Sequence, residues 1–137
     1  MADLSVTAAS VAPGTGAQIQ TATSGATLTA GQVIYLDTAD SNKAKLSDAN
    51  AGALLAEVAG ITVNGAASGQ PIRYQKSGSI NVGATLTVGQ TYINSTNAGG
   101  IAPISDLQTG SYVSILGVAT SATNLKLGII NSGTVRA

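Results

Sequence analysis

The stretch Gly25-Ala26-Thr27-Leu28-Thr29-Ala30-Gly31-Gln32 returns 58 residues later as Gly83-Ala84-Thr85-Leu86-Thr87-Val88-Gly89-Gln90, differing only at Ala30 against Val88. Later landmarks recur too: Val58-Ala59-Gly60-Ile61 resembles Ile115-Leu116-Gly117-Val118, and Ser77-Gly78-Ser79 resembles Ser132-Gly133-Thr134. A repeat of this length indicates one supersecondary unit used twice. Two copies are too few for a solenoid. We therefore expect two related halves of one β-sandwich or barrel, at about residues 25–80 and 83–137.

Short runs rich in β-branched and aromatic residues, separated by polar turns, predict strands along most of the chain. The expected strands are Gln18–Gln20, Gln32–Leu36, Lys43–Leu46, Val58–Val63, Pro71–Gln75, Ser79–Val82, Tyr112–Ala119 and Leu125–Ile130, with the second copy repeating the plan in between. Only Asp48–Glu57 holds helix-forming residues, and Gly52 limits it to one turn or a loop. Because no helix is long enough to connect parallel strands, the pairing should be antiparallel. The predicted fold is an all-β, jelly-roll-like antiparallel sandwich or barrel of about ten short strands.

Residues 1–23 have few apolar residues, separated by small ones, and this pattern predicts an extended N-terminal arm followed by the first strand. Leu4, Val6 and Val11 are spaced by small residues, and Pro13-Gly14 then breaks the run. Such an arm either completes a sheet or reaches a neighbouring molecule. The three apolar side chains are our candidate partner-binding residues, ahead of a single β domain over residues 24–137.

The composition excludes several classes of function. Charged residues make up 9% of the 137 residues, and six basic and six acidic side chains cancel. Binding to nucleic acid needs clustered Lys and Arg, which are absent, so we expect no nucleic-acid partner. No apolar run approaches a transmembrane helix and the first residues lack a signal sequence, so we expect a soluble chain made in the cytoplasm.

The residue types needed for most enzyme chemistry are also missing. Without His or Cys there is no Ser-His-Asp triad, thiolate nucleophile or imidazole metal ligand. Asp37 and Asp40 are the closest pair of carboxylates, but they lie in a polar turn where Asp side chains bond local backbone amides. We predict no enzyme, no catalytic or metal-binding residue and no cofactor.

The remaining conspicuous residues have structural explanations. Gly31 and Gly89 close the two copies of the repeated stretch and are expected to adopt positive φ. The four tyrosines lie inside predicted strands, where core packing is the simplest role. The chain therefore reads as a structural or interaction module.

The order of these elements resembles a family of small tailed-bacteriophage head proteins, the capsid decoration or cement proteins. The resemblance rests on Met1-Ala2-Asp3-Leu4-Ser5-Val6-Thr7-Ala8, Gly31-Gln32-Val33-Ile34-Tyr35-Leu36-Asp37, Val58-Ala59-Gly60-Ile61, Gly69-Gln70-Pro71-Ile72, Gly83 to Tyr92, Gly99-Gly100-Ile101-Ala102-Pro103 and Leu116-Gly117-Val118-Ala119-Thr120-Ser121-Ala122-Thr123. These are scaffold signatures spread over the whole chain. Phage fibre and tail proteins carry segments similar to the last two.

The resemblance implies a structural virion protein on the outer surface of a phage head. It would sit there, commonly as a homotrimer, and stabilise contacts between subunits of the major capsid protein. The alternative is a receptor- or carbohydrate-binding module of a tail or head fibre, which should show an exposed aromatic cluster. No individual capsid contact is carried over, because the resemblance lies in scaffold positions.

Overall fold

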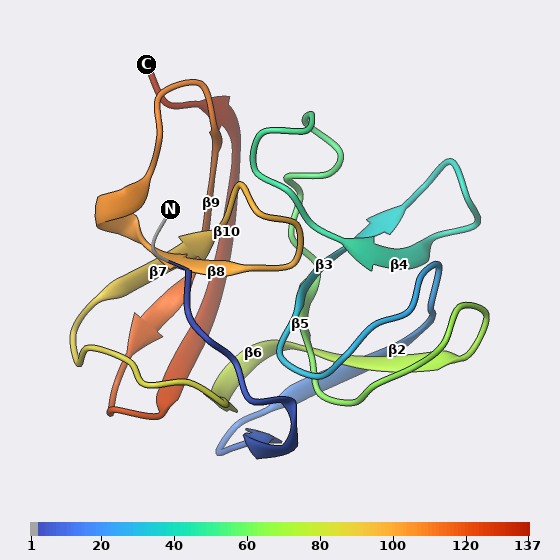
Figure 1. Cartoon of the computed structure of the whole chain (residues 1–137), viewed down its shortest axis with the longest axis horizontal. Helices are drawn as coiled ribbons and strands as arrows, with labels where there is room; N and C mark the ends of the chain where they lie inside the picture. Colours follow the sequence, from blue (N-terminus) through green and yellow to red (C-terminus); the bar gives the residue numbers. More distant parts are fainter. Residues whose placement is uncertain (1–2) are drawn as a thin grey trace.

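The computed structural model describes residues 3–137 and is built almost entirely from strands. In that part of the chain ten strands join in one curled sheet (Figure 1), with every strand pair antiparallel. The strands are β1 (Val11–Pro13), β2 (Gln18–Thr23), β3 (Val33–Asp37), β4 (Lys43–Leu46), β5 (Gly60–Thr62), β6 (Pro71–Val82), β7 (Thr91–Asn94), β8 (Ile101–Pro103), β9 (Tyr112–Ala119) and β10 (Asn124–Val135). Two single-turn 3-10 helices cover Ala8–Ser10 and Ile104–Asp106. The all-β antiparallel class is confirmed.

The long strand β6 is the centre of the sheet. The strand order is β4-β3-β5-β6-β10-β9-β7-β8, while β1 and β2 both pair with β6 outside this path. One edge of β6 takes β2 and then β1, because these pair with residues 71–77 and 80–82. The opposite edge takes β5 at residues 74–75 and β10 at residues 77–81. The sheet therefore divides into two lobes around β6, which Figure 1 shows on the two sides of the picture.

Each lobe is a five-stranded unit with the same connectivity. The first unit runs β2-β3-β4-β5 and the first part of β6, and the second runs from the end of β6 through β7-β8-β9-β10. In both, the spatial order is third, second, fourth, fifth and first strand. Strand β6 is thus the last strand of one unit and the first strand of the next. This arrangement explains why the repeated stretch begins directly after β2 and directly after β6.

The glycine that closes the repeated stretch makes the same backbone hydrogen bond in both copies. The amide of Gly31 donates to the Thr62 carbonyl at 2.9 Å, and the amide of Gly89 donates to the Ala119 carbonyl at 2.8 Å. Both glycines adopt positive φ, +86° and +82°, which only glycine does without strain. The prediction for these two positions is confirmed. Each copy is a turn that ties the entry of the second strand to the fourth strand of its unit.

A leucine anchors each copy of this turn in the interior. Leu28 donates its amide to Ala66, and Leu86 donates its amide to Ala122, both at 2.8 Å. Leu28 packs in a cluster with residues of β3, β4 and β6, and Leu86 packs in a larger cluster that joins the two units. The larger cluster contains Val33, Val58, Ile61, Ile80, Val82, Leu86, Tyr92, Ile101, Leu116, Ala119, Leu125 and Leu127. Because this core draws on both units, we treat the two lobes as one packed body.

Several sequence expectations differ from the structure in their boundaries. Residues 71–82 form one continuous strand where two short strands were expected, because the chain passes Gly78 at φ +86° without leaving the sheet. Strand β10 extends to Val135. The segment 48–57 contains turns and bends but no helix, in line with the expected loop. No helix within residues 3–137 is long and apolar enough to cross a membrane.

Candidate binding surface

The segment between β4 and β5 is the largest departure from the repeat, and it is shaped by its own hydrogen bonds. The buried Ser47 hydroxyl donates to the Leu55 carbonyl at 2.6 Å, and the same carbonyl accepts the Asp48 amide at 2.9 Å. Gly52, at φ +131°, allows the chain to reverse between these anchors. The Ser114 hydroxyl of β9 donates to the Ala56 carbonyl at 2.6 Å. The segment is thereby held against the second unit.

Three adjoining hollows lie where this segment meets β10, and we call them together the junction hollow. Their volumes are about 440, 690 and 250 Å³, and neighbouring hollows share lining residues. The apolar and aromatic side chains of the lining come from Leu36, Leu54, Val58, Ala59, Tyr74, Tyr112, Ile129 and Ile130. Glu57 and Lys76 are the only charged residues in the lining. The surface is therefore suited to packing against uncharged side chains.

At the junction hollow, the side chain of Asn131 on β10 is hydrogen-bonded to the backbone of Val58. The Asn131 amide group donates to the Val58 carbonyl at 3.0 Å, while its carbonyl oxygen accepts the Val58 amide at 2.9 Å. The Asn131 side chain thus bonds the backbone of Val58 as a neighbouring strand would, at the point where β10 leaves β6. Beside it, Ile130 is 59% exposed. An exposed isoleucine next to apolar hollows is a feature of contact surfaces.

The structure places the three candidate arm residues against their own chain. Leu4 and Val11 pack against the larger core cluster. Val6 and Val11 lie close to Gly31, so closely that a Cβ there would overlap both side chains. All three are half-buried. Their assignment as contacts to a partner stays a prediction, and in this conformation their side chains are already used. Residues 1–2 of the predicted arm lie outside the described residues.

The arm supplies a hydrogen bond to the second unit that the first unit makes within itself. In the first unit, the amide of Gly25 donates to Ala44 of β4 at 2.8 Å, which joins the end of the first strand to the third. In the second unit, the corresponding acceptor on β8 is Ile101, and it takes the amide of Leu4 at 2.8 Å. The arm therefore bonds to β8 through Leu4, and it bonds to Gly83 just after β6 through the amide of Thr7 at 2.7 Å.

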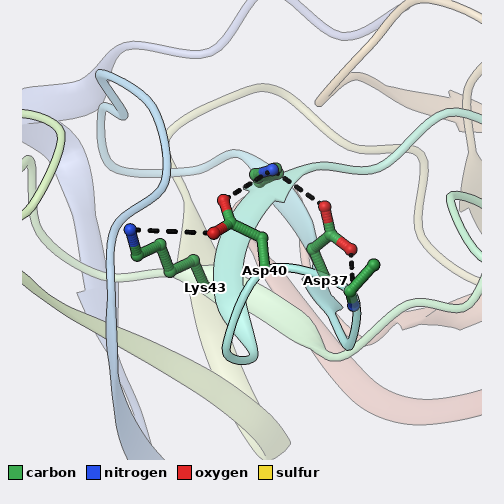
Figure 2. A network of polar contacts seen from close by, with 5 residues as sticks. Asp37, Asp40 and Lys43 are labelled. Carbon is green, nitrogen blue, oxygen red and sulfur yellow. Dashed lines mark hydrogen bonds and ion pairs between the residues drawn. The ribbon is translucent and has the colours of Figure 1, made fainter.

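The carboxylates considered for chemistry are engaged in a salt-bridged turn. At the tip of the β3–β4 hairpin, Lys45 Nζ lies 2.8 Å from Asp37 and 3.0 Å from Asp40. Asp37 also accepts the Ala39 amide at 3.0 Å, as predicted for a local turn contact, and Lys43 lies 3.8 Å from Asp40. Figure 2 shows both carboxylates turned toward the lysines.

This network lowers the pKa of both aspartates. The hydrogen bond from Lys45 is the largest cause of the lowered pKa of Asp37 and of Asp40. The same contacts raise the pKa of the Lys45 ammonium, first through Asp37 and then through Asp40. A carboxylate that stays ionised at neutral pH has no proton to donate, so neither aspartate is suited to act there as a general acid.

Other residues considered in the sequence also occupy structural positions. Tyr35, Tyr74 and Tyr92 are buried as expected, whereas Tyr112 is half-buried beside the junction hollow. Asn94, which begins an Asn-Ser-Thr sequence, is 1% exposed and donates to the Ser47 hydroxyl at 2.8 Å. Residues 3–137 hold no cluster of three or more potential acidic metal ligands.

Sequence reasoning did not find the junction hollow. Ile129, Ile130 and Asn131 looked like the end of a strand followed by a turn, and nothing local signals that β10 continues past β6. One sequence difference does lie on this side of the molecule: the segment from Asp37 to Glu57 is longer and more charged than its counterpart from Ser95 to Ser111. No protein-family model matches the chain, and no curated protein matches its sequence.

Proposed function

We propose that this chain is a non-enzymatic structural protein of a bacteriophage virion. It binds the outside of the head and stabilises contacts between subunits of the major capsid protein. The observation that carries the proposal is the junction hollow, a wide and almost uncharged surface built by the segment that breaks the internal repeat. The resemblance of the scaffold signatures to capsid decoration proteins supplies the partner.

The distribution of the tyrosines favours this function over a fibre-type carbohydrate-binding module. Sugar-binding modules stack exposed aromatic rings on the faces of their ligands. Three of the four tyrosines are buried here, including Tyr74 in the wall of the hollow, and Tyr112 is the one tyrosine that is half-buried. A single half-buried ring is a weak platform for a sugar.

Apolar contact should dominate the binding energy. A few well-packed apolar anchors commonly carry most of the affinity of an interface. Ile130 has the exposure and the position to be such an anchor, because it lines the hollow and is not covered by its own chain. The homotrimer implied by the resemblance would add avidity, since three copies engage one capsid site together.

Co-sedimentation with purified heads that lack the protein tests the proposal. We expect the wild-type chain to pellet with heads and Ile130→Asp to bind at least about tenfold more weakly, a change of about 1.4 kcal/mol. Val88→Asp is the matched control, because Val88 is 63% exposed and lies away from the hollow. Absence of wild-type binding would reject the proposal, and equal loss in both variants would reject the assigned surface.

A further inference from the structure

The outer edge of β2 has backbone groups without a partner strand at Ile19 and Thr21, whereas its end is bridged to β4 through Ser24 and Ala44. The amide of Ser24 donates to Gln70 at 2.8 Å, and the Ser24 carbonyl accepts from Gly69, so Ser24 faces the β6 side. The next residue, Gly25, faces the opposite way and donates to β4. Because backbone groups alternate along an antiparallel strand, Ile19, Thr21 and Thr23 point their N–H and C=O groups away from β6. The end of this edge at Thr23 adjoins β4 through the bridge between Ser24 and Ala44, so Ile19 and Thr21 are the open positions.

The hydrogen bonds of Arg73, the partner of Thr21 on β6, also indicate that the backbone groups of Thr21 point away from β6. Thr21 lies opposite Arg73. The amide of Arg73 donates to the Asn64 side chain at 2.7 Å, and the Arg73 carbonyl accepts the Val63 amide at 3.0 Å, both on the far side of β6 from β2. Thr21 and Arg73 therefore form a non-hydrogen-bonded pair, and the backbone groups of Thr21 are left for a third strand.

The margin strands elsewhere in the sheet carry features that discourage such pairing. β4 has Lys43 and Lys45, while β8 and β1 end in Pro103 and Pro13. The end of β10 contains a shift in register and Gly133 at φ +69°. Charges, prolines and bulges are the usual protections of a strand edge. β2, with the sequence Gln-Ile-Gln-Thr-Ala-Thr, has none of them, and its one pairing irregularity adds the extra residue to β6.

The positive charge on β6 next to this edge favours an added strand that carries carboxylates. Arg73 is exposed on β6, and within residues 3–137 it takes part in no ion pair. The side chains of Thr21 and Arg73 lie on the same face of the sheet, close together as in any non-hydrogen-bonded pair. A third strand would lie two strand spacings, about 9.6 Å, from β6. A glutamate on that strand could meet Arg73 across the small Thr21 side chain.

We propose that the outer edge of β2, from Gln18 to Ala22, binds an extended acidic segment of another protein as an added β-strand. The backbone of Ile19 and Thr21 supplies the hydrogen bonds, and Arg73 selects carboxylates on the exposed face. A second copy of β2 would fit less well, because symmetric pairing brings cations from both copies to one surface without opposing carboxylates. The edge is separate from the junction hollow.

Titration of the nitrogen-15-labelled full chain with a model peptide tests this inference by NMR. The probe is acetyl-Thr-Glu-Val-Glu-Thr-Glu-Val-amide, which places every glutamate on one face of a strand. We expect the largest amide shifts in residues 18–22 and at least about tenfold weaker binding of the same peptide with Lys in place of Glu. Shifts elsewhere, no shifts, or equal binding of the two peptides would overturn the proposal.

Two variants separate backbone pairing from charge selection. Thr21→Pro removes an outward amide and leaves the ladder to β6 in place, so peptide binding should fall at least about fivefold while unfolding in urea stays close to wild type. Arg73→Glu should abolish the preference for Glu over Lys peptide. Lys126→Glu, on β10, makes the same change of charge away from β2 and should keep that preference. Wild-type behaviour of Arg73→Glu would contradict the assignment.

The peptide titration involves no phage heads. Its failure would therefore leave the head-binding proposal standing, and failure of head binding would leave the β2 edge standing.

Discussion

At the scale of single residues, two glycines show how the repeat constrains side-chain size. Gly60 on β5 and Gly117 on β9 occupy the same place in the two units, each facing the backbone of the fifth strand. A Cβ on Gly60 would overlap the Gln75 carbonyl oxygen, and a Cβ on Gly117 would overlap the Lys126 carbonyl oxygen. The backbones approach too closely at both sites for any other residue.

Gly117→Ala should therefore destabilise the protein by about 1–3 kcal/mol, the usual cost of overpacking an interior site. Gly128→Ala is the matched control in the neighbouring strand, because a Cβ there meets no atom within 4 Å. Its effect should stay within about 0.5 kcal/mol, or be slightly stabilising. Urea unfolding of both variants measures the difference, and equal midpoints would show that the two backbones are not in close contact.

The salt-bridged turn gives a prediction about pH. The pKa of Asp37 and of Asp40 is lowered in the folded chain, so the unfolded chain binds more protons near their ordinary pKa. The contribution of Lys45 is therefore complete above about pH 4 and is lost as the pH falls below it. Lys45→Met should lower Tm at about pH 7, and the difference in Tm from the wild type should shrink as the pH falls toward about 2.

Lys126→Met serves as the control for this comparison, because Lys126 is exposed and forms no ion pair within residues 3–137. Its Tm should follow the wild type at every pH. A gap between wild type and Lys45→Met that stayed constant from neutral to acid pH would show that the aspartates do not supply the interaction.

At the scale of elements, most strands could be predicted and their partners could not. Lys43–Leu46 and Tyr112–Ala119 were predicted with their observed bounds because alternation and turn residues mark them locally. The Ser-Gly-Ser stretch around Gly78 looked like a turn, but the chain stays paired there. The reason is non-local: Gly78 passes so close to Gly16 that a Cβ would overlap the Gly16 carbonyl.

The position of the arm could not be predicted either. Its apolar residues are evident in the sequence, but the surface on which they pack is not. Leu4 bonds to Ile101 of β8 and packs against the larger core cluster, so its contacts exist only once the second unit has formed. Leu4→Ala should destabilise the protein by about 1–2 kcal/mol, at or below the low end for a leucine because the side chain is half-buried. Ser5→Ala is the control, since Ser5 is exposed. Equal stability of the two variants in urea would mean that the arm is not anchored through Leu4.

At the scale of the whole molecule, the shared strand β6 couples the two units. Residues 71–77 complete the first unit and residues 77–82 begin the second, so neither unit can lose β6 without affecting the other. We expect a single cooperative unfolding transition, with coincident curves for backbone and tyrosine circular dichroism. Two separated transitions would contradict this coupling.

The internal repeat thus accounts for the fold, while the departures from it account for the surfaces assigned to partners. The repeated turns are closed by backbone hydrogen bonds within the chain. The junction hollow exists because one unit has a long segment where the other has a short one, and the β2 edge exists because β2 follows an arm and not another unit.

Heat-induced release of DNA from phage heads is the most direct test of the central claim. Heads lacking this protein are incubated with the wild-type chain, with Ile130→Asp or with Val88→Asp, and the temperature of DNA release is measured by a dye. The account predicts a higher release temperature with the wild type and with Val88→Asp, and no increase with Ile130→Asp. An unchanged release temperature with saturating wild-type protein would contradict it.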